Sequence, residues 1–199
     1  MDESVKLFFQ EKGYYLARGV FSAEEIVLLE KEFDRIVSQI STKGEDIDAT
    51  WAGAAINDIK RKGDLILHTH NVQQFSAVWL RAFLQEKFLA TASAILGDDI
   101  ILHHSKLFQK PAEKGSPFPI HQDWSYFPTI KNSMIAAIIH VSDATDDMGC
   151  LRVYEGSNGL GRLDASNGLQ ASVSETMARS GLRNNTRREW VAGWSPLYP

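Results

Sequence analysis

The sequence predicts a single α+β domain in which helices come first and short strands follow. Apolar residues recur at helical spacing in two long runs, 22–40 and 76–96. After Gly97 the pattern changes to short strand-like runs, which are bounded by Pro, Gly or Asp and recur about every ten to fifteen residues. Helices followed by such strands indicate a chain whose second half is a sandwich or a barrel.

The helical part carries clear start and stop signals. A short helix is expected over 4–13 and a strand over 14–20. Ser22 and Glu25 form a capping box, in which each side chain can accept a hydrogen bond from the other residue's backbone N–H. Gly97 is well suited to end the second long helix.

The part after Gly97 is expected to contain four strands and then a less regular segment. Beyond Tyr154 the composition is dominated by Ser, Ala, Asn and Gly, which is poor for a buried strand, although 187–194 could form a last one. The four expected strands cover 100–109, 120–127, 134–142 and 150–154.

Composition excludes several classes of function. Lys and Arg number 21 against 25 Asp and Glu, so the net charge of −4 provides no basic field for nucleic acid. The single Cys150 excludes an internal disulfide and favours a reducing compartment, and we expect a buried, unactivated thiol there. An acidic N-terminus and the lack of a long apolar run predict a cytoplasmic protein without a membrane span.

One tripeptide, His121-Gln122-Asp123, has the spacing of a metal site. In a strand, residues i and i+2 point to the same side, so His121 and Asp123 would present an imidazole nitrogen and a carboxylate to one point. An iron(II) site of the two-histidine, one-carboxylate type needs such a pair. The alternative is a surface strand with two solvated polar residues.

The other histidines have weaker claims to a metal. His140 would lie inside an apolar strand, as a core or pocket-wall residue. His103 and His104 are adjacent on an expected strand, so their side chains should point to opposite faces. A zinc- or copper-binding protein would draw on four histidines: 68, 70, 103 and 104.

Several short segments occur in an order that is similar to one known family. These are GYY (13–15), FSAEEI (21–26), SKLFQKP (105–111), PIHQD (119–123), VSDAT (141–145) and GCLRVYEGS (149–157). From about residue 7 to about residue 163, the chain resembles the phytanoyl-CoA dioxygenase family. The resemblance implies a single domain over 1–199, with helices at 1–97 packed on a jelly-roll (double-stranded β-helix, cupin-like) barrel at 98–199.

The resemblance also implies a reaction and its cofactors. Family members are Fe(II)- and 2-oxoglutarate-dependent oxygenases that use O₂ to hydroxylate a C–H bond, here of a small or lipid-like substrate. His121 and Asp123 match two of the metal ligands. Because Asp123 is present, a halogenase is disfavoured.

The chain departs from the family at the third ligand. Ser180 and Arg187 match the residues that bind 2-oxoglutarate, but Ala178 stands where the family has a histidine. The interval before Ala178 is also short, which implies a barrel with an incomplete second half. The third coordination position could be taken by water or by Glu175, or the chain could bind no catalytic metal.

Two main hypotheses about function follow. The first is an oxidoreductase, a non-haem Fe(II)- and 2-oxoglutarate-dependent dioxygenase. The alternative is a catalytically impaired or dead member of the family, which lacks the distal histidine and acts as a binding protein. The sequence leaves the oligomeric state open.

Overall fold

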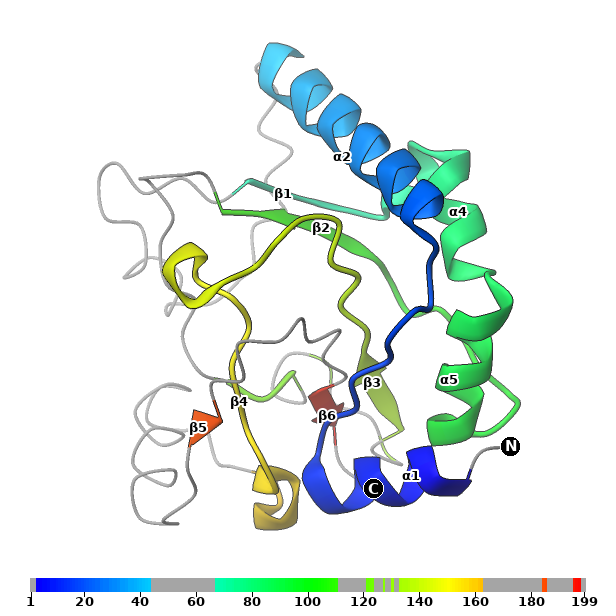
Figure 1. Ribbon diagram of the computed structural model, residues 1–199, viewed down its shortest axis with the longest axis vertical. Helices are drawn as coiled ribbons and strands as arrows, with labels where there is room; N and C mark the ends of the chain where they lie inside the picture. The colour runs from blue at the N-terminus through cyan, green and yellow to red at the C-terminus, as the bar shows by residue number, and fades with distance from the viewer. Residues whose placement is uncertain are drawn as a thin grey trace. The chain divides into compact units, whose positions relative to one another are not determined.

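The computed structural model describes residues 3–43, 67–110, 121–123, 127, 130, 133–162, 184–185 and 195–197. Figure 1 shows helices and short strands in these residues, which confirms the expected mixed class. The chain divides into two compact units. Unit 1 comprises Met1–Arg18, Thr91–Asp99 and Pro117–Pro199, and unit 2 comprises Gly19–Ala90 and Ile100–Ser116.

Unit 2 is built on the long helix α2 (Ala23–Lys43). The predicted capping box is confirmed, because Ser22 N donates to Glu25 Oε2 over 2.7 Å and Glu25 N donates to Ser22 Oγ over 3.2 Å. The apolar stripe of α2 is buried at Leu29 and Ile36, which are each 2% exposed. Burying such side chains is the main source of helix stability in a folded domain.

The expected single helix over 76–96 is wrong, because two helices occupy this run: α4 (Ala77–Phe83) and α5 (Glu86–Leu96), which begins in unit 2 and ends in unit 1. Each helix has its own cap. Ser76 Oγ accepts from Trp79 N over 3.3 Å, and Gln85 Oε1 accepts from Phe88 N over 3.0 Å. Since these side chains satisfy N–H groups that a helix start leaves open, a second helix can begin at Glu86.

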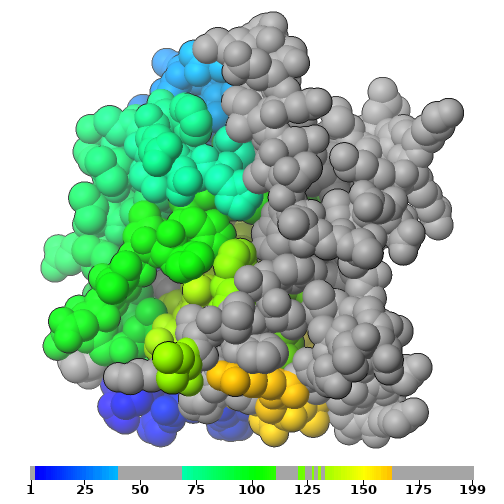
Figure 2. Space-filling view, turned by 180° about the vertical axis from the view of Figure 1, so that it is seen from behind, coloured from blue at the N-terminus to red at the C-terminus, as the bar shows by residue number. Residues whose placement is uncertain are grey.

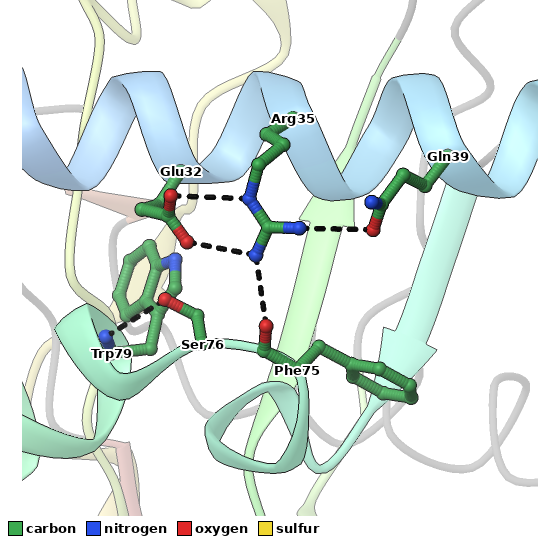
Figure 3. Close-up of polar contacts among 6 residues, drawn as sticks. All are labelled: Glu32, Arg35, Gln39, Phe75, Ser76 and Trp79. Atoms are coloured by element: carbon green, nitrogen blue, oxygen red, sulfur yellow. Dashed lines mark hydrogen bonds and ion pairs between the residues drawn. The ribbon is translucent and has the colours of Figure 1, made fainter.

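Arg35 joins α2 to the turn that precedes α4 (Figure 3). Its guanidinium donates to both carboxylate oxygens of Glu32 over 3.1 and 2.8 Å, to Gln39 Oε1 over 3.0 Å, and to the backbone oxygen of Phe75 over 2.8 Å. Arg35, and in second place a hydrogen bond with Ser76, lower the pKa of Glu32. One planar cation therefore links two turns of α2 to the chain segment that leads into α4.

The sheet of unit 2 pairs β1 (Leu67–His70) with β2 (Lys106–Gln109) in antiparallel register. Thr69 lies opposite Leu107, and both are buried, at 0% and 4% exposure. The expected strand over 100–109 is confirmed only at 106–109, because 101–105 form no strand.

The run 14–20, which was also expected to be a strand, forms none. The chain turns at Gly19 instead, where φ is +62°.

Unit 1 begins with α1 (Glu3–Lys12), which ends at Gly13 as expected. Its other elements are β3 (Met134–Ala136), η3 (Asp146–Met148), β4 (Val153–Tyr154), η4 (Ser157–Leu160), β5 (Asn184–Asn185) and β6 (Ser195–Leu197). Two antiparallel pairs form, β3 with β6 and β4 with β5. In both Figures 1 and 2, α1 and the segment that contains η4 lie side by side.

The strands of unit 1 are shorter than expected. The runs 134–142 and 150–154 are strand only at 134–136 and 153–154. The chain bends between them because η3 ends at Gly149, where φ is +72°, a conformation that favours glycine. The expected strand 187–194 lies outside the described residues. The jelly-roll barrel and the single domain remain predictions.

Within the part of the chain that the structure describes, no helix combines the length and the apolar character needed to cross a membrane.

Candidate metal centre

His121 and Asp123 meet in unit 1. His121 Nε2 lies 3.0 Å from Asp123 Oδ1, and each side chain is 24% exposed. The expected strand over 120–127 is wrong for these residues, since 121–123 belong to no strand. Instead, Phe127 N donates to Asp123 O over 3.0 Å and closes a turn. The two side chains therefore converge without the alternation of a strand.

The spacing of this pair fits two adjacent ligands of one metal ion. Ligands about 2.1 Å from a divalent ion and at right angles to each other lie about 3.0 Å apart, which is the distance between His121 Nε2 and Asp123 Oδ1. Imidazole nitrogen and carboxylate oxygen are also suitable donors for Fe(II). Without a metal, the same distance allows an N–H···O hydrogen bond, so the pair can be held together in advance.

The other residues that the sequence assigned to the site are not part of the described structure. Ala178, Ser180, Arg187 and the alternative ligand Glu175 lie outside the described residues. Among the described residues, no group of three His, Cys, Asp or Glu side chains is arranged to hold a metal ion. His140 is half-buried and follows β3, but it lies outside any strand, contrary to expectation.

A second group of imidazoles lies in unit 2. His103 Nδ1 and His104 Nδ1 are 2.7 Å apart, so the expectation that these side chains point to opposite faces is wrong. The reason is that 101–105 form no strand. The His70 ring stacks on the His104 ring, with centroids 5.6 Å apart and an angle of 24° between the planes. From the sequence, His70, His103 and His104 were considered together only as possible zinc or copper ligands, and their actual proximity depends on the pairing of β1 with β2.

Cys150 is half-buried and not fully buried as expected, but its thiol is not activated. Burial, and in second place Asp146, raise the pKa of the thiol. Its Sγ donates to Asp146 Oδ1 over 3.3 Å, and Arg152 forms an ion pair with the same oxygen at 3.2 Å. A thiol that donates to a carboxylate is stabilised in its protonated form, so this cysteine is not activated as a nucleophile.

Comparison with known proteins identifies one family and several distant relatives. The family described as "Phytanoyl-CoA dioxygenase (PhyH)" matches residues 9–181. A "Probable alpha-ketoglutarate-dependent hypophosphite dioxygenase" of Stutzerimonas stutzeri is 25% identical over 151 residues, which cover 75% of this chain and 51% of the relative.

Two further relatives are similar to the same extent. The "Phytanoyl-CoA dioxygenase, peroxisomal" of Mus musculus is 24% identical over 155 residues, which cover 76% of this chain and 46% of the relative. An "Ectoine dioxygenase" of Sphingopyxis alaskensis is 24% identical over 155 residues, which cover 75% and 47%. The chain thus spans about half the length of these curated relatives.

Proposed function

Because the chain belongs to the phytanoyl-CoA dioxygenase family, we propose that it is a non-haem Fe(II)- and 2-oxoglutarate-dependent dioxygenase. Its proposed substrates are O₂ and a small or lipid-like molecule with an oxidisable C–H bond. The observation that carries the proposal is the 3.0 Å separation of His121 Nε2 and Asp123 Oδ1, which suits two ligands of one ion. The relative named as alpha-ketoglutarate-dependent supports the choice of co-substrate.

Each proposed site residue has a distinct task. His121 and Asp123, whose side chains are each 24% exposed, would hold the iron. The guanidinium of Arg187, with the Ser180 hydroxyl beside it, would bind the far carboxylate of 2-oxoglutarate, since a planar fork pairs with both carboxylate oxygens. When bound, the iron would supply open coordination positions for the co-substrate and O₂.

The fold belongs to the same proposal. Residues 98–199 would form an incomplete jelly-roll barrel in a single domain with the helices at 1–97. The antiparallel pairing of β3 with β6 and of β4 with β5 supports this, because a jelly roll is built from antiparallel strands.

A second candidate function rests on the proposed third ligand. Ala178 has no donor atom, so a chain that holds iron only through His121 and Asp123 would bind it weakly. Such a chain could still bind 2-oxoglutarate or another ligand without turnover. This would make the protein a catalytically impaired member of its family that acts in binding.

Anaerobic titration separates these candidates. Fe(II) and 2-oxoglutarate are added to the chain, the visible charge-transfer band of the ternary complex is recorded, and succinate is measured after O₂ is admitted. A dioxygenase gives both the band and succinate, whereas a binding protein gives no succinate. The variant Asp123→Asn should lose the band, and Asp147→Asn, an exposed position on η3, should retain it. A chain that gives neither signal is not a dioxygenase.

A further inference from the structure

Gln122 stands between the two proposed iron ligands, and its side chain contacts a different part of unit 1. The side chain is half-buried, and its Nε2 donates to the backbone oxygen of Gly161 over 3.0 Å. Gly161 directly follows η4, with φ +80° and ψ −172°, a conformation that favours glycine. The ligand turn, by which we mean His121–Asp123 and the turn that Phe127 N closes on Asp123 O, is thereby connected to a segment 39 residues later in the sequence.

That segment is in turn fixed to the C-terminal end of α1. Asn158, only 9% exposed, donates through Nδ2 to Gln10 O over 2.6 Å, and Gly156 N donates to Lys12 O over 2.8 Å. The last carbonyl groups of a helix have no partner inside the helix. The segment 155–161 therefore caps α1 from a distant part of the sequence, a contact that Figure 1 lets the reader follow.

Two further contacts hold the segment in place. A Cβ at Gly13 would lie 2.6 Å from Asn158 Oδ1, so the close approach of the asparagine requires the glycine. At the edge of the contact, Lys12 Nζ and Glu155 Oε1 form an ion pair at 3.0 Å. The helix end and the segment 155–161 are thus joined by several contacts that support the Gly161 carbonyl.

We propose that Gln122 is a positioning residue, which holds His121 and Asp123 in their converging geometry by anchoring the ligand turn to Gly161 and through it to α1. The proposal rests on the metal-binding role proposed above for these two residues. Groups that orient metal ligands without touching the metal typically change affinity by about 10- to 100-fold when they are removed. We expect a change near the lower limit, because Gln122 acts through the backbone.

The test compares two methionine variants of the full chain. Gln122→Met keeps the length of the side chain and removes its donor. Gln85→Met removes a similar donor in unit 2, where Gln85 Nε2 bonds Val20 O over 2.9 Å, and also removes the cap of α5. Mn(II) serves as a redox-stable probe of the metal site, and its binding is followed by the loss of the free-ion signal in electron paramagnetic resonance.

Gln122→Met should bind Mn(II) about tenfold more weakly than the wild type, whereas Gln85→Met should bind it with unchanged affinity at temperatures where both are folded. Equal affinities for Gln122→Met and the wild type would overturn the proposal. Equal weakening in both variants would also overturn it, because the effect would then be one of general stability.

A second measurement does not require a metal. The Phe127 amide donates to Asp123 O, so its hydrogen exchange reports on the order of the ligand turn. Exchange should be faster in Gln122→Met and unchanged in Gln85→Met. If the wild type binds no Mn(II), the proposed iron site is wrong, and the hydrogen exchange of Phe127 alone tests whether Gln122 positions the turn. Unchanged exchange of Phe127 in Gln122→Met would then contradict the positioning role of Gln122.

Discussion

At Gly13, two constraints on the backbone can be separated by experiment. The residue has a φ of +77°, and an added Cβ would meet Asn158 Oδ1. Gly19 has a φ of +62° and no atom within 4 Å of the added Cβ. Gly13→Ala should therefore lower the free energy of unfolding by about 2 to 3 kcal/mol and Gly19→Ala by only about 1 kcal/mol, both measured by urea denaturation. Equal losses of stability in the two variants would contradict a steric conflict between a Cβ at position 13 and Asn158 Oδ1.

The thiol of Cys150 provides a second prediction for a single residue. Burial is the larger cause of its raised pKa, and the neighbouring Asp146 adds to the effect. Asp146→Asn should lower the pKa of the thiol and so speed its alkylation by iodoacetamide at pH 8. Asp147→Asn, one residue away on the same turn η3, is the control and should leave the rate unchanged. An unchanged rate in Asp146→Asn would mean that burial alone protects the thiol.

Ala178 allows the predicted ligand set to be tested directly. If this position corresponds to the distal histidine of the family, Ala178→His should raise the affinity for Fe(II) by about tenfold or more, since a third donor is added. Ala171→His places a histidine in the same part of the sequence and should have a smaller effect. Anaerobic titration gives both values, and an unchanged affinity in Ala178→His would mean that Ala178 is not at the ligand position.

The sequence predicted His121 and Asp123 because their types and spacing are local. It predicted the wrong backbone for them, since 121–123 form no strand, and the hydrogen bond from Phe127 N to Asp123 O has no signature in the tripeptide itself. Gln122 could not be identified in the same way. Its role depends on a carbonyl 39 residues away, and a hydrogen bond to a backbone oxygen requires no particular residue type at that position.

At the scale of elements, the helices were predictable where a side chain near the helix end marks the boundary. Ser22 with Glu25, and Gly13 at the end of α1, are examples. The break between α4 and α5 was missed because the apolar pattern continues across it, with Trp79, Phe83 and Phe88 in a row of ring contacts. Apolar periodicity indicates which side chains lie on the same buried face, and two consecutive helices can both contribute side chains to that face.

The network between α2 and α4 predicts how stability depends on pH. Because the pKa of Glu32 is lowered in the folded chain, its carboxylate stabilises the fold above the unfolded-state value, and this contribution is lost as the pH falls through the folded-state pKa. The stability difference between the wild type and Glu32→Gln should be largest near neutral pH and shrink below about pH 4. Urea denaturation from pH 3 to pH 7 measures it.

Arg35 provides the control for this prediction. It is the largest cause of the lowered pKa of Glu32 and donates to both oxygens of that carboxylate (Figure 3). In an Arg35→Met background, Glu32→Gln should cause a smaller and flatter loss of stability across the same pH range. If the stability loss caused by Glu32→Gln depends on pH as strongly in the Arg35→Met background as in the wild type, the lowered pKa of Glu32 is due to Ser76 instead.

At the scale of the whole molecule, the general change from helices to short strands was predictable, but β1, which precedes α4, was missed, and the pairing of the strands was not predictable. The described strands of unit 1 contain two or three residues each, and β3 pairs with β6 across about sixty positions of sequence. Such short strands carry almost no alternation, so nothing in the sequence identifies their partners. The resemblance, confirmed over residues 9–181, identified the family, but it predicted none of these strand pairs.

The capping of α1 by the segment 155–161 has a consequence for how the protein is made. The helix is synthesised before this segment, because the Asn158 amide that bonds Gln10 O comes 148 residues later in the sequence. Closing a loop of that length costs about 4 kcal/mol of chain entropy. Until the segment 155–161 has been synthesised, the last turn of α1 depends on water for the hydrogen bonds that Gly156 N and Asn158 Nδ2 supply in the folded protein.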